Sequence, residues 1–375
     1  MDEKISFQKY DLISPEQAMQ MAIQEAYQGA PFVSPNPLVG CVIVDSQHRF
    51  LAVGYHERHG FAHAEINALQ KLAVNELKDT QFYVTLEPCA HEGKTPSCAK
   101  TLAQYPIKKV VYGLIDPNPL VCGQGANILR EAGIEVDEYK GPLKTQLTEL
   151  VEVFLKNFKL KQTFIAAKVA ASLDGQIALK SGESRWITSE HSRHFVHALR
   201  SWYDAVVVGR KTIELDNPSL NIRHDVIQKE NKVIIIDPSA QILEKIKNGT
   251  QYKFRQSHKA ENIFFAVSKK LSLDKSLLQG FQILEFSNLV ELHQLFWQAN
   301  LKSVFIEGGA LTYSSFLQMR LVDRLHLFLA PQIIGAKNGL SWSSAFYIEN
   351  LQERLVLKNT QTKKIGADLY MTGTF

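Results

Sequence analysis

Residues 82–98 read FYVTLEPCAHEGKTPSC, and this stretch contains two of the four cysteines of the chain, Cys89 and Cys98. Its first part, FYVTLE, is rich in aromatic and β-branched residues and predicts a buried strand. The second part is a polar loop, after which the sequence predicts a helix over 97–104. A strand that leads through a loop into a helix is typical of an α/β sheet.

The residues around this stretch extend the α/β pattern through the first half of the chain. Ser14-Pro15-Glu16-Gln17 has the signature of a capped helix start, and Gly29 ends that helix. Helices that alternate with strands indicate a sheet covered on both faces. The remaining expected elements are strands at 38–45 and 50–56, a helix at 64–72, a strand at 108–116, a helix at 126–133, a strand at 134–139 and a longer amphipathic segment at 142–160.

The alternation restarts after residue 160. A strand over 164–173 ends at the tight turn Asp174-Gly175, and a helix follows over 189–203. Because 375 residues exceed one typical core and no internal repeat is present, we expect two different α/β domains. We assign an N-terminal arm to residues 1–13, one domain to 14–160 and a second domain to 161–375. The further strands expected in the second domain are 204–209, 232–237, 262–267 and 302–309, with late antiparallel strands at 326–331 and 369–375.

Composition and charge narrow the class of protein. Lysine and arginine total 42 and aspartate and glutamate total 38, which gives a formal charge of +4, and the basic residues are scattered. This pattern argues against nucleic acid as a partner and fits a small anionic substrate. The longest apolar runs have the length of strands, so no membrane span is expected. The N-terminus lacks the features of a signal peptide, and we expect a cytoplasmic protein whose cysteines stay reduced.

A histidine and a glutamate at 63 and 65 precede the two cysteines by about 25 residues. His63, Cys89 and Cys98 offer three ligands for a tetrahedral zinc ion and leave the fourth position to water, as in catalytic zinc sites. A structural zinc needs a fourth protein ligand. His91 lies on the loop between the ligands and Cys41 lies within a strand, so neither is an obvious fourth ligand.

Glu65 stands next to the predicted ligands without being needed as one. Zinc brings the pKa of a bound water near neutrality, and Glu65 is suited to take the proton of that water and pass it to a leaving ammonia. A histidine, a glutamate and a Pro-Cys pair are the parts of a zinc-dependent base deaminase. The sequence therefore resembles the cytidine-deaminase-like superfamily. Most members carry Pro-Cys-x-x-Cys, whereas eight residues separate Cys89 from Cys98 here.

The wider cysteine spacing points to one branch of that superfamily. Together with Ser-Pro-Asn-Pro at 34–37, Asp-Pro-Asn-Pro at 116–119 and Gly-x-Gly at 123–125, the loop resembles the deaminase of riboflavin biosynthesis. The resemblance implies a diaminopyrimidinone substrate that carries ribose 5-phosphate. It further implies that the ring or the ribose is contacted by Asn36 and His56, and the substrate and its phosphate by His91 and Lys94.

A second group of motifs occupies the C-terminal half. The strand VFIE runs into Gly308-Gly309 and a helix begins at Ala310, an arrangement that presents bare amides and a helix N-terminus to a phosphate. The Gly-x-Gly-x-x-Gly fingerprint of the Rossmann fold is missing here. Taken alone, Glu-Gly-Gly is as typical of a plain tight turn. Further blocks surround it, among them 168–175, 182–188 and 212–223.

Together these blocks resemble the reductase domain of the same pathway, which is related in fold to dihydrofolate reductase. The resemblance implies that NADPH reduces the ribose of the deaminated product to a ribityl chain. It also suggests self-association. The cofactor contacts that it implies are Ala170, Trp186, Thr212, Asp216, Gly308 and Gly309. The implied substrate contacts are Ser184, Arg200, Leu220, Arg223 and Glu307.

The leading hypothesis is a bifunctional zinc-dependent deaminase and NADPH-dependent reductase, and two others stay open. A nucleic-acid-editing deaminase with an accessory binding domain needs a basic groove with stacking aromatic residues. A non-enzymatic zinc-clipped module with a nucleotide-sensing domain needs a fourth protein ligand. The proton donor of the reduction is not identified by the sequence, although Asp216 and Glu307 are candidates.

Overall fold

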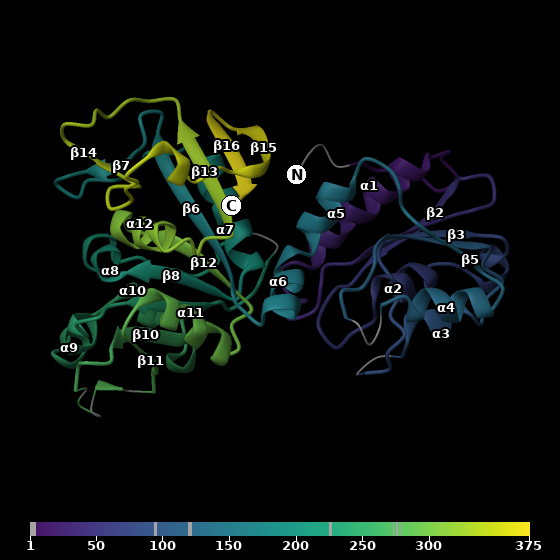
Figure 1. Cartoon of the computed structure of the whole chain (residues 1–375), viewed down its shortest axis with the longest axis horizontal. Coiled ribbons are helices and arrows are strands. Elements are labelled where there is room, and N and C mark those ends of the chain that lie inside the picture. Colours follow the sequence, from purple (N-terminus) through teal and green to yellow (C-terminus); the bar gives the residue numbers. More distant parts are fainter. Residues whose placement is uncertain are drawn as a thin grey trace. The chain divides into compact units, whose positions relative to one another are not determined.

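The computed structural model describes residues 5–93, 96–118, 122–224, 227–272, 274, 277–278 and 280–375. The chain divides into two compact units, Met1–Leu160 and Lys161–Phe375 (Figure 1). Within the described residues, no helix is both long enough and apolar enough to cross a membrane.

The first unit is built on a five-stranded mixed sheet. Two antiparallel pairings join β2 to β1 and β1 to β3, whereas β3, β4 and β5 run parallel to one another. The parallel part of the sheet begins with β3, and directly after β3 the chain enters the loop that contains Cys89 and Cys98. The strands, in their spatial order, are β2 (Phe50–Tyr55), β1 (Gly40–Val44), β3 (Gln81–Leu86), β4 (Lys109–Leu114) and β5 (Glu135–Glu138).

Helices cover both faces of this sheet, which makes the unit an α/β/α sandwich (Figure 1). One apolar core lies under α1 and α5, and a second core lies on the other face under α2, α3 and α4. The predicted capping box of the first helix is present, with Ser14 and Gln17 bonded to each other's backbone N–H groups. The helices are α1 (Pro15–Ala26), α2 (Ala64–Leu69), α3 (Cys98–Leu102), α4 (Gln124–Glu131), α5 (Lys144–Leu150) and α6 (Glu152–Leu160), with 3-10 turns at Tyr27–Gly29 and Val74–Leu77.

Two details of this unit differ from the sequence-based expectation. The amphipathic segment over 142–160 is two helices, because Val151 has non-helical angles (φ −112°, ψ 14°) and its side chain is buried in the core. The segment before Ser14 is attached to the sheet rather than loosely held. Leu12 forms a bridge with Arg49, and Ile13 is buried.

The second unit contains a nine-stranded sheet. From β11 to β13 all neighbouring strands are parallel, and β16 and β15 complete the sheet in antiparallel orientation. The expectation of an antiparallel strand over 326–331 was therefore wrong for its pairing with β6, which is parallel, and right for its pairing with β16. The order is β11 (Gln282–Phe286), β10 (Ile263–Ser268), β9 (Lys232–Ile236), β8 (Ala205–Gly209), β12 (Ser303–Gly308), β6 (Phe164–Ser172), β13 (Arg324–Ala330), β16 (Asp368–Thr374) and β15 (Lys358–Ile365), beside a small sheet of β7 (Gln176–Leu179) and β14 (Gly339–Ser341).

This second sheet also separates two cores. One core contains side chains of α11 and α12, and the other contains side chains of α9 and α10. Alternate residues of β8 and β9 therefore face different cores. The helices are α7 (Glu190–Trp202), α8 (Arg210–Asp216), α9 (Gln241–Lys247), α10 (Lys253–Ser257), α11 (Leu289–Gln298) and α12 (Ala310–Gln318), with 3-10 turns at Ala260–Asn262 and Leu351–Glu353.

Candidate active sites

Three predicted zinc ligands come together in the first unit. His63 is the N-cap residue of α2, Cys89 follows β3, and Cys98 is the first residue of α3. Their ligand atoms all lie within 4.8 Å of one another. The His63 Nδ1 atom is 3.6 Å from the Cys89 sulfur and 3.3 Å from the Cys98 sulfur.

The packing of α2 on β2 explains why His63 reaches the cysteines. A side chain at Gly54 would lie 2.4 Å from the backbone nitrogen of Ala68 and 2.6 Å from the carbonyl oxygen of Ala64. Only glycine permits this close approach between strand and helix. The approach places the start of α2 beside the carboxyl end of β3, where the cysteine loop begins.

The donor set fits Zn²⁺. One imidazole nitrogen and two sulfurs are ligands that zinc prefers. Hydrogen bonds from Cys98 and His63 hold the pKa of Cys89 well below its usual range, which favours the thiolate that binds a metal, whereas the contact with Cys89 and burial raise the pKa of Cys98. Among the described residues, the cluster contains no fourth histidine, cysteine, aspartate or glutamate. Cys41 is buried within β1 and His91 is exposed, as expected for residues outside the cluster.

Glu65 lies in the first turn of α2, beside the cluster, and is buried. Its Oε2 atom makes no hydrogen bond to the residues that the structure describes. Burial raises the pKa of Glu65 to about 6. A buried carboxyl with a free oxygen and a pKa near neutrality is suited to exchange protons with a substrate.

The residues predicted to bind the pyrimidine substrate are only partly brought to this site. His56 is buried and packs edge-on against His63, with 5.0 Å between ring centroids, and its Nε2 lies 3.1 Å from Nδ2 of Asn36. Asn36 and His56 thus adjoin the cluster. His91 lies exposed on the loop between the cysteines, and Lys94 falls outside the described residues.

Two residues that hold the cysteine loop were not predicted from the sequence. Ser97 is buried, and its hydroxyl donates to the carbonyl of Cys89 (2.8 Å) while it accepts the N–H of Lys100 as the N-cap of α3. Glu87 is buried at the end of β3 and accepts three backbone N–H groups from residues 116–126. A charged residue at the end of an otherwise apolar strand was the available signal for Glu87.

In the second unit, Arg200 and Glu307 form a buried ion pair. The Arg200 Nε and Nη2 atoms lie 2.5 Å and 2.9 Å from the two carboxylate oxygens of Glu307, and Nη1 donates to the carbonyl of Asn221. Neighbouring His197 accepts the N–H of Arg223 at Nδ1, and burial lowers its pKa to about 4. The predicted substrate residues Arg200, Arg223 and Glu307 therefore belong to one cluster.

Lys168 belongs to the same cluster and was not predicted as a site residue. It lies on β6 next to Glu307 on β12, because Ala167 is paired with Ile306 in the parallel register. Burial lowers the pKa of the Lys168 amine, against the opposing effect of the Glu307 charge. An ammonium with a lowered pKa is a stronger acid than a solvated lysine. Its place within the Lys-x-Ala-x-Ser motif was the available signal.

Gly308 and Gly309, which precede α12, lie beside α8. A side chain at Gly308 would lie 2.9 Å from Thr212, and Gly309 adopts φ +89°, which favours glycine. Thr212, Gly308 and Gly309 are thus adjacent, as a shared cofactor site requires. The backbone of Asp216, at the end of α8, accepts a hydrogen bond from Arg185.

The other predicted residues of this unit lie in less defined surroundings. Trp186 is exposed, with the Arg193 guanidinium 4.3 Å from its ring centroid. Ala170 and Ser184 are half-buried. The Leu220 side chain is buried in the core, so a substrate contact there would have to come from its backbone.

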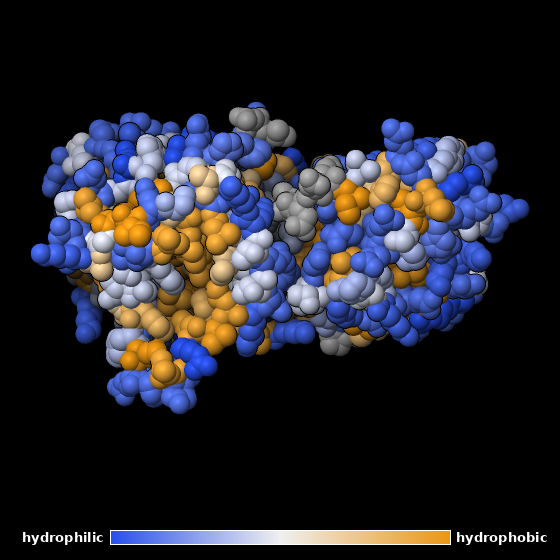
Figure 2. Space-filling view, turned by 90° about the horizontal axis from the view of Figure 1, so that it is seen from above, coloured by the Kyte–Doolittle hydropathy of each residue, from blue (hydrophilic) through white to orange (hydrophobic). Residues whose placement is uncertain are grey.

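Large apolar side chains are exposed where the parallel strands end. Such residues follow β6 and β13, and others lie on α8 and in the first turn of α12, the helices that follow β8 and β12. Figure 2 shows a hollowed apolar area on the second unit. The carboxyl ends of parallel strands are where open α/β sheets bind ligands. The exposed residues are Leu173, Leu215, Leu311 and Ile333.

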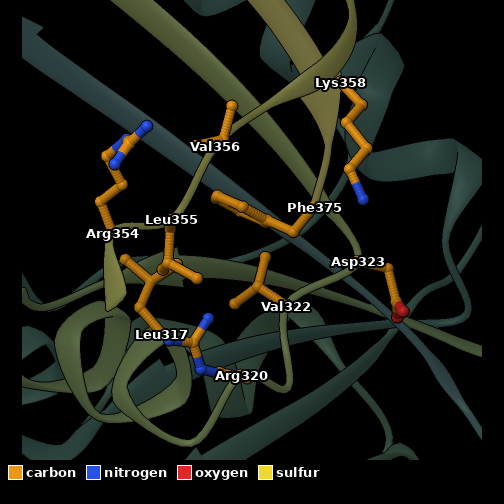
Figure 3. A pocket seen from close by; sticks show the side chains of 9 residues that line it. All are labelled: Leu317, Arg320, Val322, Asp323, Arg354, Leu355, Val356, Lys358 and Phe375. Carbon is orange, nitrogen blue, oxygen red and sulfur yellow. The ribbon is translucent and has the colours of Figure 1, made fainter. Parts of the chain in front are cut away.

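A cavity of about 390 Å³ lies at the opposite end of the second sheet, beside the start of β13. Figure 3 shows Arg320, Arg354 and Lys358 around apolar side chains that include Val322 and Phe375. None of the predicted site residues lines it. The cavity is therefore separate from the clusters described above.

Comparison with known proteins gives a family match in each unit. Residues 163–371 match the family model described as the RibD C-terminal domain, which covers more than half of the chain. The chain belongs to the RibD family. Residues 13–114 match the cytidine and deoxycytidylate deaminase zinc-binding region.

Full-length relatives of the RibD family align over both units. The chain is 35% identical to the riboflavin biosynthesis protein RibD of Actinobacillus pleuropneumoniae over 94% of this chain and 93% of that protein. It is 31% identical to the RibD protein of Escherichia coli, with 94% and 97% covered. The solved structure of a diaminohydroxyphosphoribosylaminopyrimidine deaminase/5-amino-6-(5-phosphoribosylamino)uracil reductase from Thermotoga maritima is similar with a TM-score of 0.80, at 30% identity and with 96% and 98% covered.

Membership of the RibD family confirms the predicted class of protein. The two-domain α/β fold, with a cytidine-deaminase-like unit followed by a RibD reductase unit, is as predicted. The chain is an enzyme of the deaminase/reductase class, with Zn²⁺ and NADPH as its cofactors. The bifunctional hypothesis is therefore favoured over the nucleic-acid-editing and zinc-clip alternatives.

Proposed function

We propose that the two units catalyse consecutive steps of riboflavin biosynthesis. Residues 14–160 deaminate 2,5-diamino-6-(5-phosphoribosylamino)pyrimidin-4(3H)-one, and residues 161–375 use NADPH to reduce the ribosyl group of the product to ribityl, giving 5-amino-6-(5-phosphoribitylamino)uracil. The observation that carries the proposal is the three-ligand cluster with buried Glu65 beside it, in a chain whose second unit matches the RibD C-terminal domain.

In the deamination, His63, Cys89 and Cys98 hold the metal and Glu65 moves the protons. When bound, Zn²⁺ supplies the Lewis acidity that makes a water molecule acidic near neutral pH. The carboxylate of Glu65 accepts a proton from the attacking water and delivers it to the departing amine. A C–O bond forms, the C–N bond breaks, and ammonia leaves. Asn36 and His56, which adjoin the cluster, orient the pyrimidine or its ribose.

In the reduction, NADPH when bound would supply the hydride that the ribosyl carbon bonded to nitrogen takes up as its bond to the ring oxygen breaks. The released ring oxygen would need a proton, which a residue of the protein must provide. Lys168 is the candidate acid, because it lies on β6 next to Glu307 and desolvation lowers the pKa of its amine. Thr212, Gly308 and Gly309 form the cofactor cradle, to which Ala170, Trp186 and Asp216 contribute. Ser184, Arg223 and the backbone of Leu220 contact the substrate and its phosphate.

The test is an assay with the diaminopyrimidine ribosyl phosphate that follows ammonia release and NADPH oxidation separately. Wild-type protein is expected to release ammonia and then consume one NADPH for each ammonia. Ammonia without NADPH consumption would overturn the reductase assignment, and neither signal would overturn the whole proposal.

Glu65→Gln separates catalysis from metal binding. The variant is expected to keep stoichiometric zinc and to lose ammonia release, while it still reduces substrate that has been deaminated beforehand. Retained deamination would contradict the role of Glu65. The neighbouring exposed Glu57→Gln is the matched control.

Three further properties, each implied by the resemblance to this family, are part of the proposal. The substrate is phosphorylated, which an assay with the dephosphorylated analogue tests through a rise in KM. Copies of the chain self-associate, which light scattering measures. The protein acts in the cytoplasm, where Cys89 and Cys98 stay reduced and able to bind metal.

A further inference from the structure

Glu87 is a buried carboxylate that the reaction above does not use. It directly follows β3 and precedes Pro88 and Cys89, and its own N–H donates to the carbonyl of Leu114. A carboxylate in this position is costly to bury unless hydrogen bonds compensate it. The groups that donate hydrogen bonds to this carboxylate therefore stabilise it in its buried position.

The side chain of Glu87 receives three backbone N–H groups from one segment. Its Oε2 atom accepts from Asp116 (3.3 Å) and Gly123 (3.0 Å), and its Oε1 atom accepts from Ala126 (3.2 Å). Gly123 is the N-cap residue of α4, and this glycine has no side chain to cap the helix. Glu87 therefore caps α4 from a neighbouring strand, with its charge at the positive end of the helix.

The start of α4 also packs directly on the residue before the zinc ligand. A side chain at Gly125 would lie 1.8 Å from the carbonyl oxygen of Pro88 and 3.4 Å from Oε1 of Glu87. The hydrogen bonds of the Glu87 carboxylate and this tight contact together attach the Pro88-Cys89 turn to the start of α4. Cys89 in turn accepts the N–H of Cys98 at its sulfur (3.3 Å).

We propose that Glu87 is a positioning residue for the deaminase site, which fixes the direction of the Cys89 sulfur by locking the Pro88-Cys89 turn to the start of α4. Groups that orient metal ligands without touching the metal commonly affect metal affinity and activity about 10- to 100-fold. The inference rests on the proposed zinc site, and it concerns the geometry of that site rather than the chemistry of the substrate.

The test compares Glu87→Gln with Gly125→Ala in the full chain. Glutamine has the same size but presents an amide donor to backbone N–H donors, and alanine at 125 pushes against Pro88 while Glu87 stays intact. Glu131→Gln, on the exposed side of α4, is the matched control. The measurements are the rate of zinc transfer to a chelator, the visible spectrum of the Co²⁺-substituted protein, ammonia release, and reduction of previously deaminated substrate.

Both variants are expected to transfer zinc about 10-fold faster or more and to shift the thiolate-to-cobalt bands, with ammonia release reduced by a similar factor. Reduction should stay within about twofold of wild type, as should every property of Glu131→Gln. If Glu87→Gln does not fold, the same measurements on Gly125→Ala decide whether the inference holds. If the cobalt spectra and the zinc-transfer rates of both variants equal those of the wild type, the inference is overturned. Absence of ammonia release in the wild type would instead overturn the proposed function, while the metal measurements still judge Glu87.

Discussion

The Arg200 guanidinium and the Glu307 carboxylate form two parallel hydrogen bonds, and both side chains are more than nine-tenths buried. The guanidinium also donates to the carbonyl of Asn221. These bonds use most of the donors that an arginine offers, so Arg200 has little capacity left to bind a phosphate. We propose that Arg200 holds Glu307 in place beside Lys168, which refines the sequence-based expectation that Arg200 contacts the substrate.

The first prediction concerns the energetics of this pair. Arg200→Met leaves the Glu307 carboxylate buried without its partner and is expected to destabilise the second unit by about 3–5 kcal/mol. The double variant Arg200→Met with Glu307→Met is expected to recover most of this stability, but no reductase activity. All four tryptophans lie beyond residue 160, so tryptophan fluorescence during urea unfolding reports the second unit alone. Recovery of activity in the double variant would show that the pair is only structural.

The second prediction concerns the acid of the reduction. Lys168→Met removes the buried ammonium next to Glu307 and is expected to lower kcat by about 100-fold or more, with a small change in the KM for NADPH. Lys168→Arg keeps the charge but does not release a proton, so it should not rescue kcat. Lys180→Met, on an exposed lysine, is the control. A rise in KM with unchanged kcat would assign Lys168 to binding instead.

The zinc cluster was predictable from sequence because its ligands are distinctive residue types in a recognisable order. Histidine at a helix start and cysteines at a strand end and a helix start are positions that the α/β pattern itself brings to one edge of the sheet. Glu87 and Lys168 were missed for a physical reason. The partners of Glu87 are backbone N–H groups, which have no residue-type signal, and the neighbour of Lys168 on β12 lies more than 130 residues away. Such partners follow from strand order, which periodicity does not reveal.

The division of the second sheet into a parallel and an antiparallel part likewise could not be predicted from sequence patterns. The late antiparallel strand expected over 326–331 is β13, which pairs parallel to β6 and antiparallel to β16. Strand orientation depends on the connections and on which neighbours are available, because the side-chain pattern of one strand is the same in both directions.

The third prediction concerns removal of the metal. Exhaustive treatment with a chelator is expected to abolish ammonia release and to leave the reduction of previously deaminated substrate within about twofold of the untreated enzyme, because the ligands lie in the first unit. Tryptophan fluorescence should not change, whereas the accessibility of Cys89 to thiol reagents should rise. Zinc added back should restore ammonia release, and a parallel loss of both activities would contradict the separation of the sites.

The fourth prediction concerns pH and His326. This histidine is buried on β13 between the hydroxyl groups of Tyr203 (2.8 Å) and Tyr370 (2.7 Å), and burial lowers its pKa to about 3. The folded state therefore binds fewer protons than the unfolded state between pH 3 and about 6.5, and stability must fall as pH falls through this window. At about 1.4 kcal/mol per pH unit, the full effect is roughly 5 kcal/mol, of which the part between pH 6.5 and 5 is about 2 kcal/mol.

His326→Gln tests this assignment through the slope of stability against pH rather than through stability itself. The variant is expected to be less stable at pH 7, because glutamine does not span both tyrosine hydroxyls, but to lose about 2 kcal/mol less on going from pH 6.5 to 5. His197, whose pKa is lowered to about 4 by burial, adds a slope of the same sign, and His197→Gln is the comparison variant. The measurement is urea unfolding followed by tryptophan fluorescence. An unchanged slope in His326→Gln would mean that the histidine is protonated in the folded protein, and its bonds to both tyrosines would then have to be donated by the ring.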